Sequence, residues 1–489
     1  MPVDSHTKIL ATIGPSSATK EQLSKLLDAG ADAFRINFSH GTHKEHRERI
    51  KLIRQLEKEK GRLISILADL QGPKLRVGNF KEEKVLLKEG QKFTLDMNPK
   101  LGDETRVCLP HKEIFAALKP GETLLVNDGY IALKVDKCDK SSAQTTVKVG
   151  GYISSHKGVN LPNTKLNISA ITEKDREDLK FALKNDVDWI GLSFVQKADD
   201  VRELKALVDG KARIISKLEK PSAIDDLENI IKESDAIMVA RGDLGVECPI
   251  QTVPVLQKRI VDVCRLHARP VIIATQMLES MIVNPTPTRA EVSDVATAVY
   301  DGADTVMLSA ETAAGKYPVA AVRMMHSIIC QVENDPLFFE LMKKSRRTPC
   351  MATEADAITF AASELSGILK NVRAIVTYSS SGFTTFLTAR ERPSLPILAL
   401  SPEIKVARQM VLVWGVKPYV NRESFKKFAH VEDCAVKYAR AAGLAKSGDH
   451  IIITAGFPLN LKGRTNMLHT VYVAVSYTHL RAHETELHL

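Results

Sequence analysis

The sequence predicts an α/β protein built on a (β/α)8 TIM barrel, because short apolar strands alternate with amphipathic helices eight times. The strand candidates are residues 8–13, 33–38, 64–69, 188–194, 213–218, 235–240, 270–275 and 304–309. Helical patterns lie between them at residues 19–29, 42–60, 172–185, 221–232 and 249–267. Thr19 and Thr172 each precede an amide or acid by three residues, so both are expected to cap the helix that follows.

A change in composition interrupts the barrel pattern after the third strand. The inserted segment is rich in Val, Leu and Thr and has frequent turn signals such as Asn127-Asp-Gly129, which is typical of a small β-barrel. An insertion at this point is expected to cover the C-terminal mouth of the barrel as a lid.

A third unit follows the barrel. Its predicted order is helix 353–369, strand 372–378, helix 382–391, strand 395–399, a helix, strand 416–420, helix 424–442 and strands near 450 and 470. This order indicates a separate α/β domain with a regulatory role. The predicted domains are the barrel (1–70 and 168–345), the lid (71–167), the C-terminal domain (346–475) and an atypical tail (476–489).

Composition limits the functional classes. The chain has 489 residues, 44% hydrophobic and 26% charged, as expected of a soluble protein with several domains. Its net charge of +9 suggests affinity for anions, but basic and acidic residues are interleaved, so nucleic acid is a weaker choice than a phosphorylated metabolite. The seven scattered cysteines and the absence of a leader or an 18-residue apolar run predict a cytoplasmic location without membrane contact.

The strongest chemical signal lies between residues 214 and 245. Lys217 and Glu219 are two residues apart at a strand end and should therefore project to the same side. Asp243 follows the next strand in a Gly-x-Leu-Gly turn whose N–H groups can face an anion. An ammonium, two carboxylates and a group of amides suit phosphoryl transfer on a divalent ion. The alternative is two buried strands that end in a chance ion pair.

Other strand ends carry polar side chains that would face the same mouth. Arg35, Asn37 and Ser39 alternate along the second strand, Asp69 ends the third strand, and Arg76 follows in the crossover to the lid. Two converging arginines would clamp a phosphate, whereas the alternative is a surface network of ion pairs.

Three further strand ends have less specific signals. Ser193 ends the fourth strand, and Ser309 and Glu311 close the eighth. Thr275 ends the seventh strand, where its hydroxyl either donates a proton through water or caps the next turn.

A second phosphate-binding signal lies in the C-terminal domain. The loop 379–384 follows a strand and opens a helix, so its hydroxyls and free N–H groups suit a phosphorylated effector. A simple serine-rich helix cap is the alternative.

These residues resemble the pyruvate kinase family from about residue 6 to about residue 475. The matching motifs, in the order of the family, are Thr12-Ile-Gly-Pro15, Arg35-x-Asn-Phe-Ser-His-Gly41, Gly72-Pro73, Lys157-Gly-Val-Asn-Leu-Pro162, Lys217-x-Glu219, Arg241-Gly-Asp-Leu-Gly245, Ala274-Thr-Gln-Met-Leu-Glu-Ser-Met281 and Ser309-x-Glu-Thr312. The resemblance implies magnesium-dependent phosphoryl transfer from phosphoenolpyruvate to ADP, giving pyruvate and ATP, with Mn²⁺ as an alternative ion. It also implies a homotetramer.

The resemblance assigns roles to individual residues. Glu219 and Asp243 would hold Mg²⁺, and Lys217 with Arg35 would neutralise the phosphoryl group in transfer. Substrate-binding residues would be Arg35, Ser193, Lys217, Ala240, Gly242, Asp243 and Thr275, with Thr275 also helping to protonate C3 of the enolate. Nucleotide contacts would come from Thr12, Pro15, Asn37, His40, Arg76 and Lys157. Ser309 and Glu311 would support the site, and the effector would bind Ser379, Ser380, Ser381, Gly382, Phe383 and Thr384, closed over by residues 456–466.

One departure from the family concerns potassium. Potassium-dependent members have Asp-Thr-Lys-Gly-Pro-Glu after the third strand, whereas this chain has Asp69-Leu-Gln-Gly-Pro-Lys74. The monovalent-cation ligands Asn37, Ser39, Asp69 and Leu70 are present, but Lys74 replaces the acid. Its ammonium can substitute for the cation electrostatically, so we predict that K⁺ is not required.

Two other functions remain open from sequence. Another barrel enzyme that handles phosphoenolpyruvate or an enolate would share Lys217, Glu219 and Asp243 but has no need of the lid. A catalytically silent metabolite sensor, or a basic RNA binder, would keep the fold without the reaction.

Overall fold

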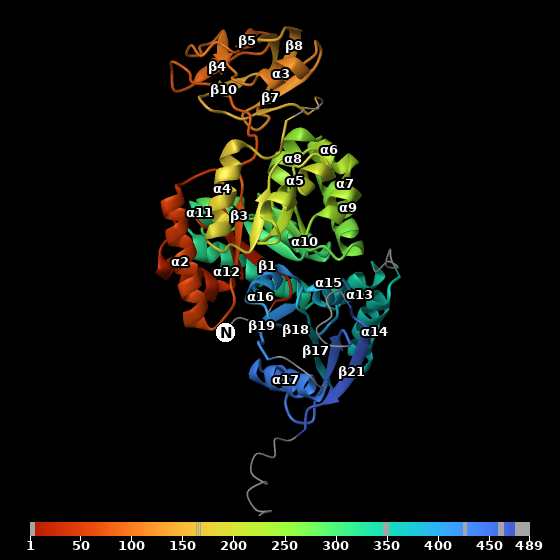
Figure 1. Ribbon diagram of the computed structural model, residues 1–489. Helices are drawn as coiled ribbons and strands as arrows, with labels where there is room; N and C mark the ends of the chain where they lie inside the picture. Colours follow the sequence, from red (N-terminus) through yellow and green to blue (C-terminus); the bar gives the residue numbers. More distant parts are fainter. Residues whose placement is uncertain are drawn as a thin grey trace, which may run out of the picture.

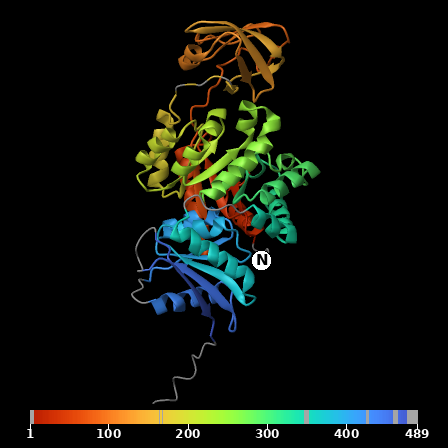
Figure 2. The same ribbon diagram turned by 90° about the vertical axis from the view of Figure 1, so that its right-hand side faces the viewer.

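The computed structural model describes residues 5–162, 164, 166, 168–345, 352–423, 428–457 and 464–474. The predicted tail at 476–489, the start of the predicted helix 424–442 and residues 458–463 of the predicted closing loop lie outside the described residues. Figures 1 and 2 show three bodies in a column, with the inserted domain at one end, the barrel in the middle and the C-terminal domain at the other end.

The central body is a closed barrel of eight parallel strands in the order β1-β16-β15-β14-β13-β12-β3-β2, as predicted. Its strands are β1 (Lys8–Thr12), β2 (Ala33–Asn37), β3 (Ser65–Asp69), β12 (Trp189–Leu192), β13 (Arg213–Leu218), β14 (Ala236–Ala240), β15 (Val271–Ala274) and β16 (Thr305–Leu308). The strands are buried nearly throughout because the outer helices cover them.

The outer layer consists of helices that follow each strand. They are α1 (Lys20–Ala29), α2 (His43–Lys60), α4 (Glu173–Lys184), α5 (Ala198–Val208), α6 (Pro221–Asp225), α7 (Leu227–Glu233), α8 (Arg241–Glu247), α9 (Val253–Leu266), α10 (Arg289–Tyr300), α11 (Ala310–Ala313), α12 (Pro318–Glu333) and α13 (Pro336–Lys344). Short 3-10 helices lie at Ile250–Thr252 and Glu279–Ile282. Thr19 and Thr172 cap α1 and α4 as predicted. The single helix predicted over 221–232 is wrong, since α6 and α7 divide at Asp226.

Four aspartates, two of them buried, organise the N-terminal ends of the barrel strands. Each stands just before one strand and accepts a hydrogen bond from an N–H near the start of the neighbouring strand. The pairs are Asp32 with Ile9, Asp188 with Ile66, Asp235 with Ile214 and Asp304 with Val271, at 2.7 to 3.0 Å. These carboxylates satisfy backbone donors that the barrel rim would otherwise leave without partners.

The inserted domain has its own core and two sheets. Its elements are β4 (Val85–Leu87), β5 (Lys92–Asp96), β6 (Arg106–Cys108), α3 (Lys112–Ala117), β7 (Thr123–Val126), β8 (Ile131–Cys138), β9 (Ser142–Val149), β10 (Gly151–Ile153) and β11 (Val159–Asn160). Six strands form the order β11-β7-β8-β9-β5-β6, and β10 pairs with β4. The edge strands β11 and β6 do not pair with each other. The hydrogen bonds between strands therefore do not close the predicted small β-barrel, and the six strands form an open sheet.

Two connecting segments join the inserted domain to the barrel, and backbone hydrogen bonds pair them with each other. The Val77 N–H donates to the Lys157 carbonyl at 3.0 Å, and the Val159 N–H donates to the Leu75 carbonyl at 3.0 Å. Figure 1 shows this paired stalk rising from the C-terminal end of the barrel. The domain therefore stands over the barrel mouth, as predicted for a lid.

The C-terminal domain is an α/β domain with the sheet order β19-β18-β17-β20-β21. Its elements are α14 (Glu354–Ile368), β17 (Val372–Tyr378), α15 (Phe383–Arg390), β18 (Ile397–Ser401), α16 (Ile404–Gln409), a 3-10 helix (Met410–Leu412), β19 (Val416–Val420), α17 (Phe428–Ala441), β20 (His450–Ala455) and β21 (Met467–Tyr472). Strand β21 runs antiparallel to β20, and the other pairings are parallel.

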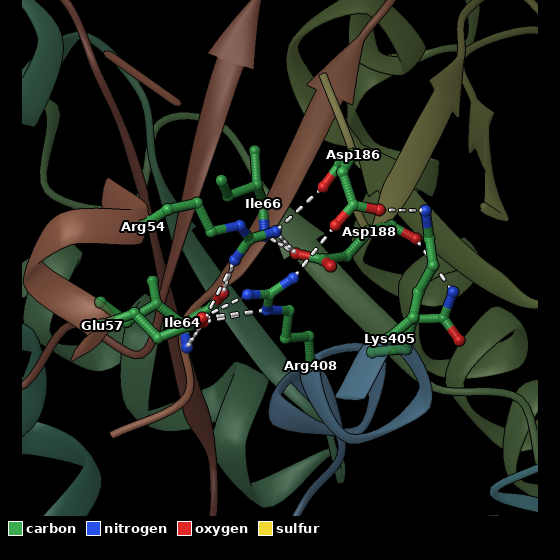
Figure 3. A network of polar contacts seen from close by, with 9 residues as sticks. Arg54, Glu57, Ile64, Ile66, Asp186, Asp188, Lys405 and Arg408 are labelled. Carbon is green, nitrogen blue, oxygen red and sulfur yellow. Dashed lines mark hydrogen bonds and ion pairs between the residues drawn. The ribbon is translucent and has the colours of Figure 1, made fainter. Parts of the chain in front are cut away.

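A buried ion-pair network fastens this domain to the N-terminal face of the barrel (Figure 3). Arg408 of α16 donates through Nε to Glu57 Oε1 at 3.0 Å and pairs with Asp186 at 3.1 Å. Arg54 links Glu57 to Asp188 at 3.2 and 2.7 Å. Leu412, four residues after Arg408, belongs to the apolar cluster that fills the barrel interior.

Within the part of the chain that the structure describes, no helix combines the length and the apolar character needed to cross a membrane.

Candidate active site

Lys217 lies at the C-terminal mouth of the barrel, near the end of β13. Its Nζ is 2.9 Å from Glu219 Oε1 and 3.4 Å from Asp69 Oδ1, and it donates to Ser193 Oγ at 2.8 Å. Lys217 and Glu219 therefore project to the same side, as predicted. Burial alone would lower the pKa of Lys217, but the carboxylates of Asp69 and Glu219 together raise it above its ordinary value. The group stays cationic at neutral pH.

Asp69 holds a second cation in the same mouth. Its Oδ2 accepts a hydrogen bond from Arg35 Nε at 2.7 Å, and Arg35 Nη1 also donates to Thr12 Oγ1 at 3.2 Å. Burial raises the pKa of Asp69, but the charges of Lys217 and Arg35 outweigh burial and keep this pKa below its ordinary value. Asp69 is thus an anion that fixes two positive groups at one place.

Glu219 lies one residue beyond β13 and is almost completely buried. Its Oε2 accepts the Phe194 N–H at 2.8 Å, which fixes the side chain. Burial, followed by the like charge of Asp243, raises the pKa of Glu219 against the lowering effect of Lys217. A divalent cation between Glu219 and Asp243 would remove that repulsion.

The predicted Gly-x-Leu-Gly turn around Asp243 is wrong, because these residues form the first turns of α8. Neither Gly242 nor Gly245 has a positive φ, so the glycines do not force a turn. Instead, the Gly242 N–H donates to Thr275 Oγ1 at 2.8 Å, which caps the helix from a neighbouring strand end. Asp243 therefore occupies a defined helical position at the barrel mouth.

The carboxylates of Glu219 and Asp243 suit a hard divalent ion whose remaining ligands come from water and substrate. Among the described residues, no group of three or more His, Cys, Asp or Glu side chains is placed to hold a metal. Mg²⁺ is commonly held by only one or two carboxylates, with water and substrate oxygens as the other ligands. Glu219 and Asp243 follow the adjacent strands β13 and β14, and their charges are close enough to interact, so they are the carboxylates available for such an ion.

Thr275 is held in an unusual backbone conformation. Its φ is +70°, and the next residue, Gln276, also has a positive φ. Arg241 stabilises this backbone, since it donates to the Thr275 carbonyl at 2.8 Å and pairs with Asp294 at 2.6 Å. The Thr275 hydroxyl accepts the Gly242 N–H at the start of α8, which is not the following turn that the sequence suggested it might cap. The same hydroxyl can still donate its own hydrogen to a ligand.

Glu311 accepts hydrogen bonds from the two segments that follow β15 and β16. Its Oε2 accepts the Ser309 N–H at 2.7 Å, and its Oε1 accepts the Leu278 N–H at 3.2 Å. The side chain is buried, and burial raises the pKa of Glu311. It therefore ties together the segments that follow β15 and β16.

Two of the oxygens predicted to ligate a monovalent ion accept hydrogen bonds from the protein. Asn37 Oδ1 accepts the Ser39 N–H at 3.0 Å, and the Leu70 carbonyl accepts Ser193 Oγ at 2.8 Å. Asp69 is engaged by Arg35 and Lys217, as above. Lys74 lines a cavity of about 240 Å³ between lid and barrel, which Asp243 also lines.

The predicted nucleotide-binding residues are divided between the barrel mouth and the lid stalk. Thr12 is buried beside Arg35, whereas Pro15 and His40 are exposed at the mouth. Arg76 donates to the His156 carbonyl at 2.8 Å within the stalk, next to Lys157. Arg76 therefore contacts the backbone of the lid connection.

The predicted effector loop connects β17 to α15. Gly382 precedes the helix with a φ of +79°, and Thr384 Oγ1 is 2.6 Å from Thr465 Oγ1. The Ser381 carbonyl accepts a hydrogen bond from Arg213, which is the first residue of the barrel strand β13. Ser379 is nearly buried, whereas Phe383 is 40% exposed.

Sequence reasoning missed several residues that organise the site. Arg213 and Arg241 act through contacts with residues far along the chain, so local pattern gives no signal for them. Glu247, which contacts the lid residue Asn160 at 2.8 Å, was missed for the same reason. Only the position of Glu247, one helical turn after Asp243, offered a hint.

Comparison with known proteins places the chain in a family. The family description "Pyruvate kinase, barrel domain" matches residues 4–322, and "Pyruvate kinase, alpha/beta domain" matches residues 356–471. The pyruvate kinase of Methylorubrum extorquens is 48% identical over 471 residues, which cover 96% of this chain and 97% of that protein. Those of Agrobacterium vitis and Clostridium perfringens are 44% and 40% identical, over 96% and 94% of this chain and 97% and 98% of their own lengths. The chain therefore belongs to the pyruvate kinase family of phosphotransferases.

Proposed function

We propose that the enzyme transfers the phosphoryl group of phosphoenolpyruvate to ADP, giving pyruvate and ATP, with Mg²⁺ or alternatively Mn²⁺ bound by Glu219 and Asp243. The observation that carries this proposal is the meeting of Lys217, Glu219 and Asp69 within 3.4 Å at the barrel mouth. When bound, the divalent ion supplies positive charge to the oxygens of the phosphoryl group.

Lys217 and Arg35 would bind the phosphoryl group during transfer. Both cations are fixed by Asp69 before substrate arrives, so little reorganisation is needed. A loose, metaphosphate-like transition state spreads negative charge over three oxygens, and fixed positive groups stabilise that charge.

The substrate carboxylate would lie against the start of α8. Backbone amides around Ala240, Gly242 and Asp243, with the Thr275 hydroxyl, are the groups available there. After the phosphoryl group leaves, Thr275 would pass a proton through water to C3 of the enolate, which yields pyruvate. Ser193 would orient Lys217, from which its hydroxyl oxygen accepts a hydrogen bond.

The nucleotide would enter from the side of the lid stalk. Thr12, Pro15, Asn37 and His40 lie on the barrel side of this approach, and Arg76 and Lys157 belong to the stalk. This division suits a nucleotide that contacts both domains at once.

Potassium independence is a further part of the proposal. Asp69 already faces two protein cations, and Lys74 adds a third positive group near the mouth. These charges would do the electrostatic work of a monovalent ion.

Regulation and assembly complete the proposal. A phosphorylated small molecule, either a sugar phosphate or a nucleoside monophosphate, would activate the enzyme through loop 379–384. Arg213 supports this role, because it joins that loop to the strand that carries Lys217. A cytoplasmic homotetramer is the expected form.

The direct test is a magnesium-dependent rate assay with phosphoenolpyruvate and ADP, repeated with phosphorylated effectors. Pyruvate must appear only when ADP is present. ADP-independent consumption of phosphoenolpyruvate would instead indicate a carboxylating or aldol enzyme, and no consumption at all would indicate a sensor.

A further inference from the structure

Glu247 is a buried carboxylate at which three segments of the protein meet. Its Oε1 accepts a hydrogen bond from Asn160 Nδ2 of the lid at 2.8 Å and pairs with Lys220 Nζ at 2.5 Å. Its side chain is only 1% exposed, and Lys220 is 17% exposed. The three residues line the cavity between lid and barrel together with Asp243.

The three residues connect the lid with both predicted metal ligands. Glu247 lies four residues after Asp243 on α8, so the two carboxylates are one helical turn apart. Lys220 directly follows Glu219 and precedes α6. Figure 1 shows α6 and α8 at the end of the barrel that faces the inserted domain.

The lid meets the same helix at a second point. A β-carbon placed on Gly129 would lie 3.6 Å from Val246 Cγ1, so the lid turn packs beside α8. The position of the lid and the position of α8 are therefore not independent.

The second oxygen of Glu247 is left incomplete. Oε2 is buried and has no hydrogen-bond partner among the described residues. A buried carboxylate oxygen is stabilised by a hydrogen-bond donor, so Oε2 is available to a further donor beside the lid. A shift of the lid would change the contacts of Glu247, which lies on the same helix as Asp243.

We propose that Glu247 is a positioning residue that couples the lid, through Asn160, to the metal carboxylates Glu219 and Asp243. The inference rests on the proposed function and adds a residue to it. Binding of ADP by the lid would set the geometry of the metal site, and binding of the metal would hold the lid in place.

The test exchanges donor and acceptor across the contact. Asn160→Asp sets two carboxylates against each other. It should raise the KM for ADP and the Mg²⁺ dissociation constant, measured by calorimetry, about tenfold or more, with a smaller change in kcat. Glu247→Gln in the same chain restores a donor–acceptor pair and should return both values to within about threefold of the wild type. A residue that only stabilised the fold would not show this rescue.

Asn98→Asp is the matched control, because it adds the same charge to an exposed lid loop away from α8. Its kinetics should equal those of the wild type. The inference would be overturned if Asn160→Asp behaved like Asn98→Asp. It would also be overturned if the double variant were as impaired as Asn160→Asp. Should the Asn160 variant fail to fold, Glu247→Gln alone carries the test: it should raise the Mg²⁺ requirement, and an unchanged requirement counts against coupling. An inactive wild type would instead refute the proposed function.

Discussion

The two ends of the barrel both bury charged side chains, but different partners cover them. At the N-terminal face, Glu57 and Asp188 pair with Arg54 and Arg408, and the C-terminal domain closes over them. At the C-terminal face, Lys217 faces its carboxylates in a mouth beneath the lid. Buried ion pairs therefore hold two domains together where protein covers them, and they preorganise charge for a ligand where the site stays open.

The largest effect should follow removal of the charge at the C-terminal face. Lys217→Met should lower kcat by about a thousandfold or more, because it removes the preorganised cation from the transferring group. Circular dichroism should show an unchanged fold, and binding of a phosphorylated effector at loop 379–384 should persist. Unchanged turnover would exclude the assigned mechanism.

The opposite result is expected at the N-terminal face. Arg408→Met should destabilise the protein by about 3 kcal/mol, because the buried Glu57 then keeps only Arg54 as a cationic partner. The measurement is urea unfolding followed by fluorescence. Lys405→Met, which removes a more exposed ion pair with Asp186, is the milder control and should change stability by less than about 1 kcal/mol. Equal losses of stability in both variants would show that burial does not determine how much an ion pair contributes.

A smaller catalytic effect should come from Thr275. Thr275→Ala should lower kcat about a hundredfold, because the proton path to C3 and the cap of α8 are both lost. Thr275→Ser keeps the hydroxyl and should retain most activity. The exchange of C3 hydrogens of pyruvate with solvent reports the proton step, and normal exchange in Thr275→Ala would contradict the assignment.

Potassium should change the rate by less than about tenfold, because protein cations already supply the charge. The assay compares tetramethylammonium buffer with and without KCl. Lys74→Glu restores the acid of potassium-dependent relatives and should make the rate depend on KCl. Activation of the wild type by about tenfold or more would refute independence.

The smallest effect concerns pH and the loop that follows β2. Burial lowers the pKa of His46 from 6.5 to about 4, and His46 packs against Phe38 and Gly41. The unfolded chain therefore binds this proton at a higher pH than the folded chain does, so stability should fall as pH drops from 6.5 towards 4. His46→Gln should weaken this dependence in urea unfolding at pH 7 and pH 5. An identical dependence in both proteins would exclude His46 as a source.

Much of the fold follows from local signals, and the site follows only in part. Strand alternation was sufficient to place Lys217 beside Glu219, and the capping threonines were read correctly. The helix at Asp243 was missed because its cap comes from Thr275, 33 residues away. Arg213 and Glu247 act across 168 and 87 residues, so only the tertiary structure reveals their partners.

The most direct test of the account is Mn²⁺ binding followed by electron paramagnetic resonance in the presence of phosphoenolpyruvate. We predict one tightly bound ion per protomer, with binding weakened about a hundredfold by either Glu219→Gln or Asp243→Asn. Lys217→Met should still bind the ion but should not turn over. Undiminished Mn²⁺ binding in both carboxylate variants would contradict the claim that Lys217 and a divalent ion act together on one phosphoryl group.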